Sequence, residues 1–124
     1  MAADQNMHTI EPMLWGTTSP MFLMLDGAIT EVWVRGVCTL TIIDPTKAEK
    51  NLSDIQSLNR IIRLLFTNAA SEGLYTLSST MQDAKALANQ NEALARSIME
   101  QVETNINVLG LSIHNIIVET IEIL

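Results

Sequence analysis

The residues of this chain that could do chemistry are few and scattered. A metal site needs clustered His, Cys or carboxylate side chains, but His8 and His114 lie more than a hundred positions apart. Glu119 follows His114 by five positions, which on a helix would point the two side chains to different faces. We therefore expect no metal ion and no cofactor.

The single cysteine, Cys38, could act as a nucleophile only with a distant histidine as its base. Its neighbours Val37, Thr39 and Leu40 are those of a small buried hydrophobic residue. The chain has no Gly-rich phosphate loop and no Gly-x-Ser-x-Gly elbow. We predict that this protein has no catalytic residues and is not an enzyme.

Trp15 and Trp33 are interpreted as packing anchors.

The composition points to association with other protein surface. The 124 residues are 48% apolar and only 17% charged, below the roughly 25% that is usual for soluble domains. Part of the apolar surface is therefore expected to meet another copy or a partner. The net charge of −7 argues against binding to nucleic acid or to an anionic membrane surface.

Several features favour a reducing cytoplasm. One cysteine cannot form an intrachain disulfide, and no basic residue precedes Arg35, so the start of the chain does not resemble a secretory signal. The best apolar stretch, residues 21–43, is interrupted by Asp26, Glu31 and Arg35. Direct membrane insertion is therefore not expected.

The acidic residues gather at the two ends of the chain. The first 34 residues and the last 28 each carry four acids and no base, and the middle has a net charge of +1. Crowding these carboxylates in an assembly would make it sensitive to acid, because like charges repel until they are protonated. The expected pH-sensitive residues are Glu100, Glu103, Glu119 and Glu122.

The first part of the chain is ambiguous between helix and strand. Residues 1–18 have no hydrophobic period and are expected to form a flexible arm. Ser19-Pro20 is typical of a helix start, and apolar residues then recur at steps of three or four as far as Ile43. The same segment is rich in β-branched residues, so 29–43 could instead form a β-hairpin turning at Arg35-Gly36.

Helical periodicity is clearer further on. Asp44-Pro45 predicts the start of a second helix, which would run to about Ala70 and close at Gly73. From 74 to about 109 the apolar and small residues alternate steps of three and four, as in a coiled-coil seam. Asn91 lies on this seam, where a polar residue can fix the register.

Gly110 then interrupts the helical pattern, and the apolar tail 111–124 fits either a helix or a strand. Such a tail is expected to pack on its own domain or on a neighbour.

Some segments resemble the R-body, or killing-trait, structural proteins. They are Leu74-Tyr75 with the Ala-rich stretch to Asn91, residues 102–110, and Ser19-Pro20 with its apolar continuation. The resemblance implies a small helical protein that polymerises into coiled ribbons, which unroll in acid.

Taken together, the sequence predicts an all-α protein of three to four amphipathic helices, with a single helical assembly domain over 19–124. Its expected function is that of a self-assembling structural subunit of a cytoplasmic homopolymer, in the form of an R-body-like ribbon. Its partner would be a second copy or a related paralogous subunit. The alternative is a small acidic chaperone or adaptor that binds an apolar partner segment. The expected assembly interface comprises Leu77, Met81, Ala84, Ala88, Asn91, Ile98, Val102, Ile116, Ile117, Ile121 and Leu124.

Overall fold

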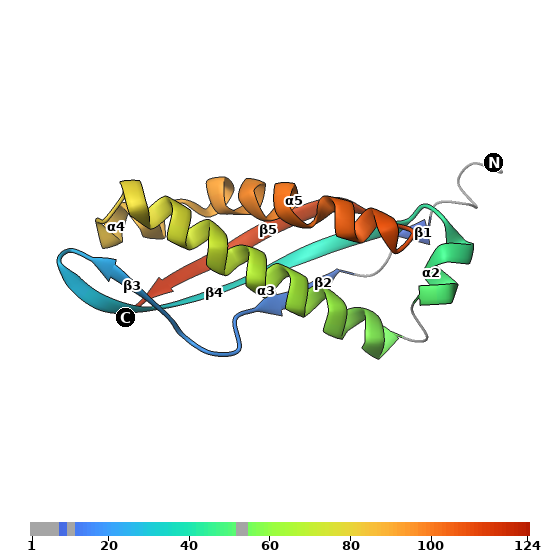
Figure 1. Cartoon of the computed structure of the whole chain (residues 1–124), viewed down its shortest axis with the longest axis horizontal. Helices are drawn as coiled ribbons and strands as arrows, with labels where there is room; N and C mark the ends of the chain where they lie inside the picture. The colour runs from blue at the N-terminus through green and yellow to red at the C-terminus, as the bar shows by residue number, and fades with distance from the viewer. Residues whose placement is uncertain (1–7, 10–11, 52–54) are drawn as a thin grey trace.

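The protein is built from one antiparallel sheet and two long helices that lie on the same face of that sheet (Figure 1). A computed structural model describes residues 8–9, 12–51 and 55–124. The fold therefore mixes helix and strand, and the prediction of an all-α protein is wrong.

The strand β4 (Ala28–Ile42) is the centre of the sheet. Along one of its edges pair, in turn, the short strands β1 (His8–Thr9), β2 (Met13–Gly16) and β3 (Met21–Leu25). The long strand β5 (Leu111–Ile123) pairs along the other edge. Every pairing is antiparallel. Because the short strands follow one another along one edge of β4 and β5 runs along the other edge, the sheet is three strands wide along most of its length.

Residues 20–43, which were predicted to be helical, form strands wherever they have regular secondary structure. Nine of the fifteen residues from 29 to 43 are Ile, Val or Thr, whose branched side chains favour a pleated surface. The chain does not turn at Arg35-Gly36. It turns at Asp26-Gly27, where both residues have positive φ (53° and 80°) and close a two-residue hairpin between β3 and β4.

Two of the predicted local boundaries are confirmed. Helix α2 (Pro45–Asn51) begins where Asp44-Pro45 predicted it, and Asp44 Oδ1 accepts a hydrogen bond from the backbone N–H of Lys47 at 3.1 Å. Gly110 ends the last helix with φ of 85° and leads into β5. The tail 111–124 is accordingly a strand rather than a helix.

Helix α3 (Ile55–Thr80) continues past Ala70 and Gly73, so the predicted end of the second helix is wrong. Gly73 is a packing residue instead. A Cβ atom there would come within 2.7 Å of Leu94 Cδ1, which lies on helix α5 (Asn91–Val108). The missing side chain lets the two long helices approach each other closely.

The expected heptad helix over 74–109 is broken into the end of α3, the short helix α4 (Ala84–Ala88) and α5. The break is fixed by both local and long-range bonds. Asp83 caps α4 by accepting from Lys85 N at 2.9 Å, and the N–H of Asp26 in the hairpin turn donates to Gln82 O at 2.6 Å. The periodic pattern alone does not show this second contact.

A single hydrophobic core fills the space between the helices and the sheet. Residues Met13 and Trp15 of β2 belong to it, so part of the segment 1–18 that was predicted to be a flexible arm lies in the sheet. Residues 1–7 and 10–11 of that arm are outside the described residues. The core contributions of the two long helices are Ile62, Phe66, Ala69, Ala70 and Leu74 from α3 and Leu94, Ile98, Val102 and Ile106 from α5.

Candidate functional site

The face of the sheet that points away from the helices is the candidate site, and we call it the outer face. Side chains alternate between the two faces of a strand. In β3, for example, Met21, Leu23 and Leu25 are buried towards the helices, and Phe22 and Met24 between them are exposed. The outer face is formed by Leu14, Phe22, Met24, Ile29, Glu31, Trp33, Arg35, Val37, Thr39, Asn115, Ile117, Thr120 and Glu122.

An apolar row crosses the outer face. The strand register aligns Leu14 of β2 with Val37 of β4, and Val37 with Ile117 of β5. Leu14 is 72% exposed and Ile117 is 50% exposed. Val37 between them is half-buried, so two of the three aliphatic side chains on this line are largely open to solvent.

A second apolar group lies nearer the β3–β4 hairpin. Met24 is the cross-strand partner of Ile29, and Phe22 is the partner of Glu31. Phe22, Met24 and Ile29 are all exposed. With the aliphatic row, this group extends apolar surface along much of the sheet. Exposed apolar groups gathered on one face are typical of an interaction site.

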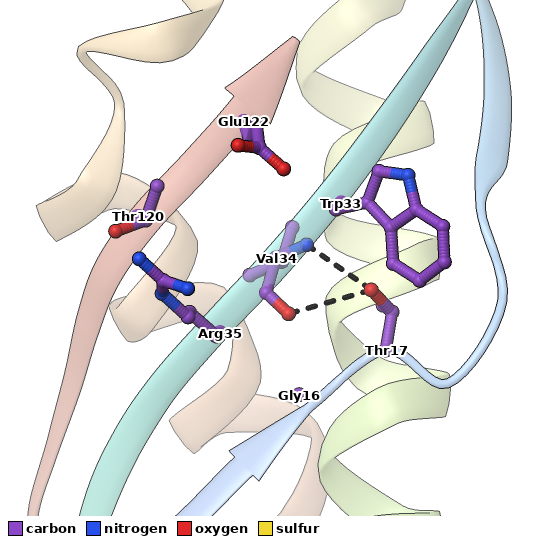
Figure 2. A pocket seen from close by; sticks show the side chains of 7 residues that line it. All are labelled: Gly16, Thr17, Trp33, Val34, Arg35, Thr120 and Glu122. Atoms are coloured by element: carbon purple, nitrogen blue, oxygen red, sulfur yellow. Dashed lines mark hydrogen bonds between the residues drawn. The ribbon is translucent and has the colours of Figure 1, made fainter. Parts of the chain in front are cut away.

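A shallow depression of about 220 Å³ lies between the two apolar groups and is lined by Gly16, Thr17, Trp33, Val34, Arg35, Thr120 and Glu122 (Figure 2). Thr17 shapes one wall, because its hydroxyl accepts from Val34 N at 3.1 Å and donates to Val34 O at 3.4 Å. Trp33 Nε1 donates to Glu31 Oε2 at 2.7 Å. The indole ring is therefore held in a fixed orientation at the rim.

The charges of this depression belong to Arg35 and Glu122. The two residues lie on neighbouring strands, where Arg35 is the partner of Thr120 and Trp33 is the partner of Glu122. In Figure 2 both side chains lie on the side of the strands away from the helices. Both are exposed, and no ion pair joins them to each other or to another of the described residues. The site thus offers one cation and one anion, close together and unpaired, within an apolar surround.

The single cysteine does not line this depression. Burial raises the pKa of the Cys38 thiol to about 12. Its side chain points to the inner face and is fully buried. Among the described residues, no three His, Cys, Asp or Glu side chains gather where they could hold a metal ion. The side chain of His8 is outside the described residues.

The residues expected to form the assembly interface fall into three groups by burial. Ile98, Val102 and Ile121 are buried in the core of the chain itself, where their neighbours already occupy them. Only Ile117 and Leu124 are exposed. The remaining residues of that set are partly buried: Leu77, Met81, Ala84, Ala88, Asn91 and Ile116.

Asn91 does not lie between helices. Its side-chain amide donates to the backbone carbonyls of Val118 at 2.8 Å and Glu119 at 3.2 Å, which belong to β5. It therefore joins the start of α5 to the outer edge of the sheet.

The four acids expected to respond to pH are all exposed. Glu100 and Glu103 lie on α5, and Glu119 and Glu122 lie on β5. Only the last of them lies in the depression. The structure does not gather these four acids into one cluster, since they occupy different elements.

Sequence reasoning missed most of the outer face, including Leu14, Phe22, Met24 and Arg35. One feature could have indicated it. The run Met-Phe-Leu-Met-Leu at 21–25 has no polar alternation, and unbroken apolar runs are typical of strands covered on both faces. Read as a strand, this run predicts apolar side chains on both faces of β3.

No helix among the described residues is both long and apolar enough to cross a membrane. No family model and no characterised sequence matches this chain. The resemblance to R-body proteins therefore stays a prediction.

Proposed function

We propose that this protein is a self-assembling structural protein whose copies meet through the outer face of the sheet. The observation that carries the proposal is the apolar row of exposed Leu14, half-buried Val37 and exposed Ile117, together with exposed Phe22 and Met24. Transferring a side chain such as Leu or Phe out of water contributes about 1.5–3 kcal/mol. A contact that covers this face would be favoured by several such contributions.

The pattern of apolar and polar residues along the strands supports a protein partner, rather than water, over the outer face. Antiparallel sheets that face water on one side alternate apolar and polar residues. Along β3 the outward positions are instead Phe22 and Met24. The composition agrees with this interpretation, because few charges are spread over many apolar residues.

The proposed contact differs from the helical seam that the sequence suggested. Ile98 and Val102 already contact the core of their own chain, so using them between copies would require the helices to separate from the sheet. Ile117 is common to both accounts, because it belongs to the expected interface and lies in the exposed row.

The alternative function, an acidic cytoplasmic chaperone or adaptor, would use the same surface. An apolar segment of a partner would then lie across Leu14, Val37 and Ile117 in place of a second copy. The two functions differ in the state of the purified protein. A self-assembling subunit associates alone, and an adaptor stays monomeric until its partner is added.

We extend the proposal to an R-body-like ribbon in the cytoplasm that responds to acid. This part rests on the resemblance of residues 74–91 and 102–110 and on the acids at the two ends of the chain. Electron microscopy of the expressed protein, between about pH 7.5 and about pH 4.5 where crowded carboxylates titrate, tests it. Ribbons that change shape in this interval support the extension, and particles unchanged in shape contradict it.

The experiment for the main proposal is light scattering with size exclusion over a wide range of protein concentration. The self-assembly account predicts a mass that exceeds 13.7 kDa and rises with concentration. A constant monomer mass contradicts it. A monomer that binds an apolar peptide, and loses that binding in a Leu14→Lys variant, would favour the adaptor.

A further inference from the structure

We infer that two copies of this chain meet face to face about a two-fold axis, so that Arg35 of each copy pairs with Glu122 of the other. This inference rests on the proposed self-association through the outer face. It adds the symmetry of the contact and the charged residues that determine its register.

Arg35 has no competing partner within the described part of the chain. Among residues 12–42 and 111–124, which contain the strands β2 to β5, Arg35 is the only Lys or Arg. Its side chain is exposed, and no described acid lies in ion-pair contact with it. A cation placed on an otherwise apolar and acidic face is therefore free to meet a carboxylate from outside.

Glu122 is a better partner for Arg35 than Glu31. Glu31 accepts the indole N–H of Trp33 at 2.7 Å, so its carboxylate has a role within the chain. No hydrogen bond of that kind holds Glu122 among the described residues, and Glu122 lines the same depression as Arg35. One free cation and one free anion thus share one depression.

Arg35 lies opposite Thr120, and Glu122 is two residues further along β5, so the two residues are diagonal neighbours, about 7–8 Å apart at Cα. In a two-fold contact, if residue i meets residue j, then residue j meets residue i. A two-fold axis that passes between Arg35 and Glu122 therefore creates two reciprocal pairs from one chain.

Apolar residues flank the depression on both sides. Leu14, Val37 and Ile117 lie on one side of the depression, and Phe22 and Met24 lie towards the hairpin on the other. The charged pairs would then specify the register, which is what such pairs do best in interfaces.

The test uses charge reversal and mixing. Arg35→Glu alone and Glu122→Arg alone each put like charges together across the axis, and each should weaken self-association at least about tenfold. An equimolar mixture of the two variants restores both opposite-charge pairs, so the mixture should associate nearly as tightly as the wild type. A single chain with both substitutions should do the same. Sedimentation equilibrium at low salt measures all four samples, and Arg63→Glu on α3 is the matched control.

The outcomes separate this inference from the proposed function. If Leu14→Lys weakens association but the mixed variants do not recover it, the outer face is an interface and the two-fold pairing is wrong. If Leu14→Lys and the charge reversals all leave association unchanged, the outer face is not the contact surface, and the proposed function itself is wrong. Circular dichroism of each variant shows whether its fold is intact. If one single variant is unfolded, the doubly substituted chain still decides the pairing.

Discussion

Gly36 of the central strand lies against the indole ring of Trp15. The two residues are cross-strand partners, and a Cβ atom at position 36 would come within 2.7 Å of Trp15 Cζ2 and would also clash with Ile117 O. The ring of Trp15 in turn packs edge-to-face on Phe66 of α3, with centroids 5.7 Å apart. Gly36 therefore makes room for the side chain that links sheet and helix.

Substitution of Gly36 by Ala is expected to destabilise the protein by about 1–3 kcal/mol, because an added methyl group overpacks the core. Urea unfolding followed by far-ultraviolet circular dichroism measures the change. An unchanged unfolding midpoint in Gly36→Ala would show that the sheet can shift away from Trp15, contrary to this account.

The thiol of Cys38 is expected to be unreactive in the folded protein. Burial raises its pKa to about 12, so almost no thiolate forms at neutral pH, and the side chain is inaccessible. An aromatic disulfide reagent should label Cys38 slowly in buffer and rapidly in denaturant. Rapid labelling of the folded protein would contradict its burial.

The same shift predicts how stability depends on alkaline pH. The folded pKa of Cys38 is about 12 against an ordinary value of 9.0, so the unfolded chain loses its proton first. The free energy of unfolding should therefore be unaffected below about pH 9 and should fall between about pH 9 and about pH 12. A Cys38→Ala variant, compared over this interval, should lack that part of the fall.

Asn91 is expected to stabilise the single chain rather than a helical seam. Its amide donates to two carbonyls of β5, so Asn91→Ala should cost about 0.5–1.5 kcal/mol. Asn91→Asp should cost more, because it replaces the donor with a negative charge facing those carbonyls. Asn89→Ala is the control, since Asn89 bonds only within its own helix region. Equal effects at both positions would contradict the assigned role.

The fold could be predicted from the sequence only where local chemistry decides it. Asp44-Pro45 supplies both the cap and the fixed φ that begin α2, and Gly110 supplies the positive φ that ends α5. The segment 20–43 could not be assigned in this way. Its apolar residues fit a helical period, but pairing of β4 with strands on both sides overrides that pattern. The Asp26-Gly27 hairpin turn was the local feature that should have decided for strand.

The candidate site was harder to predict, because it is defined by which apolar residues the fold leaves uncovered. Ile98 and Ile117 are equally apolar in the sequence. The first is buried beneath the sheet and the second is exposed on its other face. Only the register between β4 and β5 brings Ile117 beside Val37 and so creates the exposed row. That register depends on contacts between residues about eighty positions apart in the chain, which periodicity alone does not contain.

The most direct test of the central claim is sedimentation velocity of two lysine variants beside the wild type. Ile117→Lys places a charge in the exposed row of the outer face, and Leu64→Lys places the same charge on α3, where Leu64 is 62% exposed. We predict that Ile117→Lys shifts the protein to monomer at concentrations where the wild type and Leu64→Lys remain associated. If Ile117→Lys sediments as the wild type does, or if only Leu64→Lys dissociates, the outer face is not the surface through which this protein assembles.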